Sequence, residues 1–155
     1  MRQRRDLAEI WLFYLGAAAL LFAVAVDAIA VIGRHIGKPL LGSIELMQAA
    51  ILIAASAAIV SATMVDKHAV VHLLIDRLSP RMRLIMGRVH AALCAVFFIA
   101  LAAGSIWIAL DLRGGNEESE LLHIPYAPLR VVSIVAVLAV ALIYTLRLAG
   151  RRREP

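Results

Sequence analysis

The sequence predicts an all-α integral membrane protein with four transmembrane helices, forming one membrane domain over residues 1–155. Hydrophobic residues make up 63% of the chain and charged residues 17%, whereas soluble domains average roughly 45–50% and about 25%. The formal net charge is +5, but the basic residues stand in short clusters between long apolar runs, and aromatic residues are few. This pattern is typical of the charged edges of a membrane protein and argues against a nucleic-acid partner.

The expected spans follow from runs that lack Asp, Glu, Lys and Arg, namely 10–26, 46–65, 89–110 and 131–146. A spanning helix needs about 20 apolar residues, and the first run reaches that length if it continues through Asp27. The fourth run is short, but the long side chains of Arg130 and Arg147 at its ends can reach the head groups. We expect spans at about 9–32, 44–65, 85–111 and 129–147. Residues 23–25 resemble a signal-peptide cleavage site, but the apolar run continues beyond them and further apolar runs follow.

The distribution of basic residues predicts the orientation of the spans. Twelve of the sixteen Lys and Arg residues lie in the N-terminal segment, in the segment between the second and third spans, or in the C-terminal segment. Basic segments stay on the cytoplasmic side of a membrane. Both termini and the middle loop are therefore predicted to be cytoplasmic, and the acidic loop that precedes the fourth span is predicted to lie outside.

The middle loop is predicted to contain an amphipathic surface helix over about residues 67–78. Its apolar residues fall on one stripe of a helix, while His68, His72 and other polar residues fall on the opposite side. The segment is too short and too charged to span, so it should lie on the membrane surface or against a partner. On the other side of the membrane, Ser43 is expected to cap the second span.

The second span carries small residues at every fourth position, in the series Ala50, Ala54, Ala58 and Ala62. Small residues at this spacing let two helices approach closely in lipid. The ridge is interpreted either as packing within this chain or as a docking face for another protein. We treat the ridge, together with His68, Val71 and His72, as a candidate partner interface.

Charged residues near the outer ends of the spans form a candidate polar cluster of Asp27, Glu45, Asp111 and Arg130. All four should lie at similar depth, where Arg130 could pair with Glu45 or Asp27, or the group could contact an external partner. The alternative is that each side chain simply reaches water. The middles of the spans are almost entirely apolar, and polar groups there are usually functional, so no catalytic, cofactor or metal site is expected.

Two other functions are compatible with a small four-helix membrane protein. A haem-binding or redox-complex anchor would need histidines facing one another across neighbouring spans, but only His90 lies within a span. A small proton-coupled exporter would need a carboxylate midway through the first span, and Asp27 lies too near its end. Both remain as alternatives.

The chain resembles the small membrane subunit of tripartite ATP-independent periplasmic (TRAP) transporters, the DctQ-type family. Glu45 matches the acidic residue at the start of the family's second span, and His68 and Val71 match a His-x-x-Val-Asp-like motif after it. His72 stands where the family usually has Asp. Residues 122–125 are similar to a Leu-x-Ile-Pro element before the fourth span.

The resemblance implies a supporting role and no enzymatic activity or cofactor. In such systems a periplasmic protein captures an organic acid, such as a dicarboxylate, another carboxylate or sialic acid, and a large permease subunit moves it inward with a sodium gradient. The small subunit supports the large one and helps to dock the binding protein. The implied partners are therefore the large permease subunit, the binding protein and membrane lipid, in a bacterial inner membrane.

Overall fold

The computed structural model describes residues 2–65, 80–115 and 117–150, and these residues are helical over most of their length. The helices are α1 (Arg2–His35), α2 (Ser43–Met64), α4 (Pro80–Asp111), the short 3₁₀ helix η1 (Leu112–Gly114) and α5 (Tyr126–Leu148). In the described part of the chain, four helices are long and apolar enough to cross a membrane. The predicted all-α membrane fold is thus confirmed, whereas the predicted surface helix at 67–78 lies outside the described residues.

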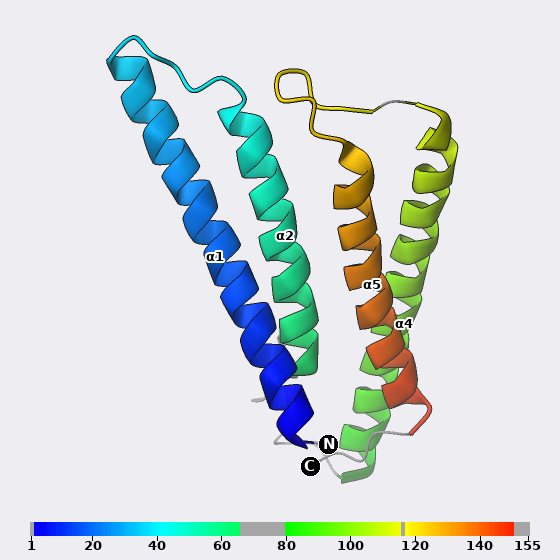
Figure 1. The fold of residues 1–155 in the computed structure, drawn as a ribbon. Helices are drawn as coiled ribbons and strands as arrows, with labels where there is room; N and C mark the ends of the chain where they lie inside the picture. The colour runs from blue at the N-terminus through cyan, green and yellow to red at the C-terminus, as the bar shows by residue number, and fades with distance from the viewer. Residues whose placement is uncertain (1, 66–79, 116, 151–155) are drawn as a thin grey trace.

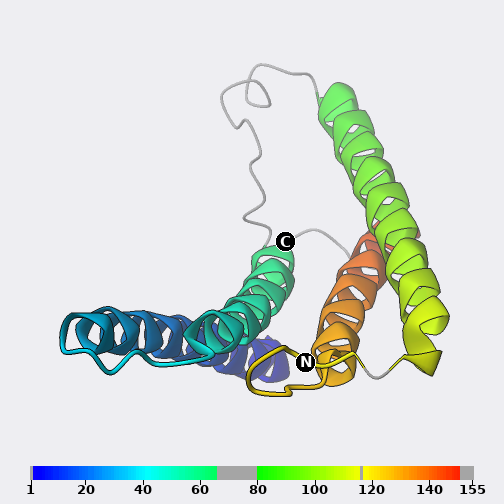
Figure 2. The ribbon, with the colours of Figure 1, turned by 90° about the horizontal axis from the view of Figure 1, so that it is seen from above.

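The four long helices stand side by side in an open row (Figures 1 and 2). α1 packs along α2, α2 packs on α5, and α5 packs on α4, so α1 and α4 occupy opposite ends of the row. Helices α1 and α2 form one hairpin, and α4 and α5 form another. We call the end with the connections 36–42 and 115–125 the loop end, and the end where α1 begins and α5 ends the terminal end.

The beginnings of α2 and α5 differ from the sequence-based expectation. Ser43 does not cap α2: it is the first helical residue, and the N-cap is Gly42, which has a φ of 77° and offers no side chain. α5 begins at Tyr126, a few residues before the expected start of the fourth span. Pro128 falls in the first turn of α5, where backbone N–H groups have no partner within the helix, so the proline is tolerated there.

Many of the buried residues between the helices are small, although Phe98 and Tyr144 are also buried, and many other large apolar side chains point outward. The α4–α5 core contains Ala91, Ala95, Phe98, Val140, Ala141 and Tyr144. Many large apolar side chains are exposed instead, including Trp11 and Trp107, which are 72% and 73% exposed. This distribution suits helices that face lipid or another membrane subunit, where small residues permit close contact between helices.

Candidate functional site

At the loop end, residues 117–125 fold into a compact loop that we call the strap. The amide of Ser119 donates to the carbonyl of Ile124, and the amide of Tyr126 donates to that of Glu117, each at 3.0 Å. The buried Ser119 hydroxyl also accepts a hydrogen bond from the amide of Ile124 at 2.9 Å. These bonds close the strap on itself, so it is a small structured unit at the loop end.

Glu45 in the first turn of α2 attaches the strap to the other hairpin. Its two carboxylate oxygens accept hydrogen bonds from the backbone amides of Leu121 and Leu122, each at 2.9 Å. Hydrogen bonds to an ionised acceptor are stronger than neutral ones. The side chain of Leu122 also lies directly over Gly42: a Cβ added there would lie 2.5 Å from Leu122 Cγ. A glycine is therefore required both for its positive φ and for this contact.

Arg130 holds the strap to its own hairpin. Its guanidinium donates to the carboxylate of Glu117 at 2.6 Å, and both side chains are partly buried. Arg130 therefore pairs with Glu117 here, and not with Glu45 or Asp27, the two partners that were considered from the sequence. Glu45 is already bonded to two strap amides, and Glu117 lies closer to Arg130 because the strap returns over the start of α5.

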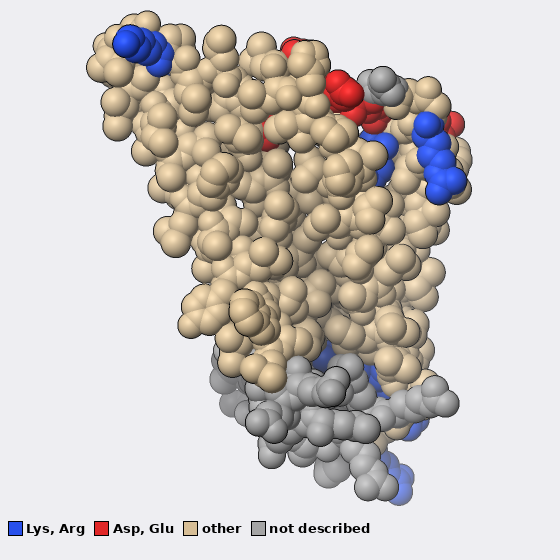
Figure 3. Space-filling view, viewed as in Figure 1, with Lys and Arg blue, Asp and Glu red and all other residues tan. Residues whose placement is uncertain are grey.

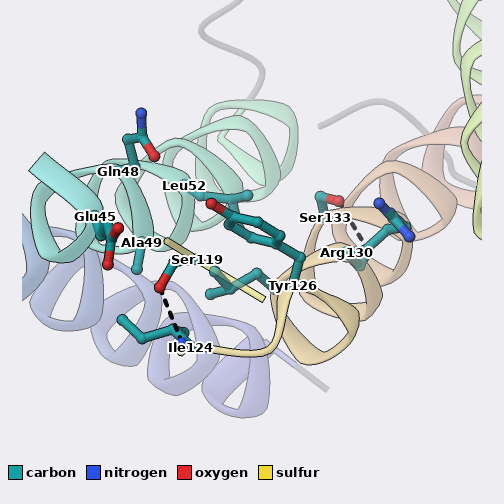
Figure 4. A pocket seen from close by; sticks show the side chains of 10 residues that line it. Glu45, Gln48, Ala49, Leu52, Ser119, Ile124, Tyr126, Arg130 and Ser133 are labelled. Atoms are coloured by element: carbon teal, nitrogen blue, oxygen red, sulfur yellow. Dashed lines mark hydrogen bonds between the residues drawn. The ribbon is translucent and has the colours of Figure 1, made fainter. Parts of the chain in front are cut away.

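A pocket of about 340 Å³ lies beneath the strap, between α2 and α5. Glu45, Gln48 and Leu52 line it from α2, while Tyr126, Arg130 and Ser133 line it from α5, as Figure 4 shows. Ser119 and Ile124 of the strap contribute further lining. The pocket is therefore lined by polar and apolar side chains from both helices and from the strap.

The predicted polar cluster is divided among three places. Glu45 and Arg130 share the pocket beneath the strap. Asp27 lies instead in a smaller hollow between α1 and α2, which Arg34 also lines. Asp111 is exposed at the end of α4. The structure thus brings together two of the four residues, Glu45 and Arg130, which bind the same strap and line the same pocket.

The alanine ridge of α2 does not form one continuous surface. Ala50 and Ala54 are buried at 4% and 5% exposure, whereas Ala58 is exposed and Ala62 is half-buried. A Cβ added to Gly16 of α1 would lie 3.6 Å from the Cβ of Ala57 and 3.8 Å from the carbonyl of Ala54. Part of the ridge therefore packs on α1, and Ala58 points away from that contact. The other candidate interface residues, His68, Val71 and His72, lie outside the described residues.

A second polar attachment between the hairpins, at the terminal end, was missed by sequence reasoning. The Arg147 guanidinium donates to the backbone carbonyl of Thr63 at 2.6 Å and lies over the Tyr144 ring, 5.2 Å from its centroid. The ring of Tyr144 in turn stacks on Phe98 and meets His90 edge-on. An arginine after an apolar run signals only the end of a span, so its partner on α2 could not be inferred.

Among the residues that the structure describes, no group of three His, Cys, Asp or Glu is close enough to hold a metal ion. His35 and His123 lie at the loop end, and His90 lies in the terminal half of α4. The Sγ atom of Cys94 lies 3.7 Å from Nε2 of His90. The chemistry visible here is therefore hydrogen bonding and packing between helices.

The family comparison decides what kind of protein carries this arrangement. The family model described as tripartite ATP-independent periplasmic transporters, DctQ component, matches residues 21–154. The chain belongs to this family. The matched residues cover α2, α4, α5, the strap and the second half of α1, so they include both attachments between the hairpins. No curated protein and no solved structure matches the chain.

Membership of the DctQ family makes the chain a small subunit of a TRAP transporter and a multi-pass membrane protein. The family consists of transporter subunits rather than enzymes. Glu45, which matches an acidic position of the family, also has a structural role in this chain, because it fixes the strap to α2.

Proposed function

We propose that this chain is the small membrane subunit of a sodium-driven TRAP transporter for organic acids in a bacterial inner membrane. It supports the large permease subunit and helps to dock the periplasmic substrate-binding protein. The observation that carries the proposal is the family match over residues 21–154. The substrate is a dicarboxylate, another carboxylate or sialic acid, and it binds to the partner proteins rather than to this chain.

The open row of helices supports the assignment of a scaffold role. In a closed bundle, each helix packs against two neighbouring helices. In the open row, α1 packs mainly on α2 and α4 packs mainly on α5, so one side of each of these two helices has no helix of this chain against it. Exposed apolar side chains occur along both of these helices, such as Leu21 on α1 and Val96 on α4. A large membrane subunit packed on one side of the row would cover part of this surface, while lipid would cover the rest.

The loop end supports the docking role. Acidic side chains gather there over the strap and the end of α4, as Figure 3 shows. The polar strap is held in place by Glu45 and Arg130, so it presents a defined surface. With the termini on the cytoplasmic side, this surface faces the periplasm, where a soluble binding protein arrives.

Reconstitution of the system with and without its partners tests the proposal. We expect the chain to co-purify with a large multi-span permease, and the pair with its binding protein to take up an organic acid into liposomes when a sodium gradient is present. Liposomes that contain the chain alone should accumulate nothing. Substrate uptake by the chain alone would show that it is an autonomous carrier and would overturn the supporting role.

A further inference from the structure

The two helical hairpins are joined in different ways at their two ends. In the half nearer the terminal end, Ile59 and Val60 of α2 pack directly on the core that contains Val140 and Tyr144. The bond from Arg147 to the Thr63 carbonyl adds a polar contact in the same region. The hairpins are therefore in tight apolar contact on this side, and such contacts resist separation.

At the loop end, the space between α2 and α5 holds the pocket of about 340 Å³ instead of packed side chains. The hairpins are bridged across it by the strap. The strap is part of the α4–α5 hairpin, but its bonds to Glu45 and its contact with Gly42 are made to the other hairpin. At the loop end, the two hairpins are thus joined by the hydrogen bonds to Glu45 and by the contact of the Leu122 side chain with Gly42.

The weaker side of the strap can be identified from its bonds. Its internal hydrogen bonds keep the loop folded, and the ion pair between Glu117 and Arg130 keeps it on α5. The two bonds to Glu45 are exposed, whereas the bond between Arg130 and Glu117 is partly buried, so water competes more readily for the bonds to Glu45. Exposed polar bonds open more readily than packed apolar contacts.

We propose that the strap is a releasable latch between the two hairpins, with Glu45 as the positioning residue that holds it closed. When the bonds to Glu45 break, the strap stays with α5, and the loop ends of the hairpins separate. The terminal ends stay together because Ile59, Val60 and Arg147 keep their contacts. Opening widens the pocket beneath the strap. This motion is a property of the chain itself, so it can be measured without any partner.

Distance measurements between pairs of spin labels test the latch on the full chain in lipid nanodiscs. In a Cys94→Ser background, one pair joins the exposed positions Ile44 and Trp107 across the loop end. A second pair joins Ala58 and Leu148 nearer the terminal end. For Glu45→Ala we expect the first distance distribution to lengthen and broaden, with the ratio of closed to open conformations falling roughly tenfold. The second distribution should not change.

Two further variants separate the latch from a general loss of structure. Gly42→Ala leaves Glu45 in place but sets a methyl group against Leu122, so it should open the loop end as well. Glu120→Gln removes a neighbouring exposed charge of the strap and should leave both distributions unchanged. If Glu45→Ala does not give a folded protein, Gly42→Ala and the milder Glu45→Gln decide the outcome.

Two results would overturn the latch. The first is an unchanged loop-end distance in folded Glu45 and Gly42 variants, which would show that other contacts hold the hairpins together. The second is an equal lengthening of both label pairs, which would show that the hairpins come apart as a whole. Neither result would bear on transport by the assembled system, so a failed latch leaves the proposed function standing.

Discussion

Two charged side chains, Glu45 and Arg147, form hydrogen bonds with backbone groups of the other hairpin. These bonds explain why each charged residue stands near the end of its helix. Glu45 accepts hydrogen bonds from two strap amides, and Arg147 donates to the carbonyl of Thr63. That carbonyl belongs to the last turn of α2, where the regular hydrogen bonds of a helix come to an end. Backbone groups near lipid need hydrogen-bond partners, and Arg147 supplies one here.

Replacing Arg147 should therefore destabilise the junction at the terminal end. Arg147→Leu removes the donor to the Thr63 carbonyl and the contact with the Tyr144 ring. We expect a loss of about 1–3 kcal/mol in the free energy of unfolding, measured by denaturant titration in detergent micelles. Arg147→Lys should retain part of the stability, because an ammonium group can still donate. Arg113→Leu, an exposed arginine at the loop end, serves as the control; equal effects of the leucine variants at 113 and 147 would argue against a specific role for Arg147.

At the scale of the helices, α2 contacts α1 through one part of its alanine ridge and leaves another part open. Ala54 is buried near Gly16, whereas Ala58, one turn later, is exposed. The sequence shows the four-residue repeat but not its rotation relative to α1. Each of the two interpretations of the ridge therefore applies to a different residue. Ala54 packs within the chain, whereas Ala58 lies on a surface that is available for a partner.

Leucine substitutions at these two positions should have separable effects. Ala54→Leu inserts a large side chain between α1 and α2, where overpacking costs about 1–3 kcal/mol, so the purified chain itself should unfold more easily. Ala58→Leu should leave the stability of the chain unchanged and reduce the amount of large permease recovered with it in a pull-down. Full recovery of the permease with Ala58→Leu would remove this surface from the proposed interface.

The sequence predicts the long helices well, because their hydropathy and the charged residues at their ends are sufficient to locate them. The lengths of the apolar runs give the four spanning helices. The strap could not be predicted, because its shape depends on bonds between Ser119, Ile124 and the distant Glu45. Glu45 and Arg130 were identified as candidates from their depth, but their partners lie in a loop whose acidic composition indicates only exposure.

At the scale of the whole molecule, the open row gives the chain two chemically different ends. The loop end carries the acidic strap (Figure 3), while in the sequence most basic residues stand near the beginning of the chain, between α2 and the first turns of α4, or from the last turn of α5 onward. Cytoplasmic segments of membrane proteins are enriched in Lys and Arg. The charge distribution along the chain thus predicts a single orientation, in which a periplasmic partner meets the strap and the terminal end faces the cytoplasm.

Cysteine accessibility in intact cells tests this orientation. In the Cys94→Ser background, Glu120→Cys places a thiol on the exposed strap, and Arg81→Cys places one on the exposed start of α4, before the expected third span. We expect a membrane-impermeant maleimide to label Glu120→Cys in cells whose inner membrane is intact, and to label Arg81→Cys only after that membrane is permeabilised. The reverse pattern would place the strap in the cytoplasm, where it could not meet a periplasmic binding protein. Labelling of both thiols in intact cells would show that the chain has no fixed orientation, and the docking role would then fail even if the chain still co-purified with a permease.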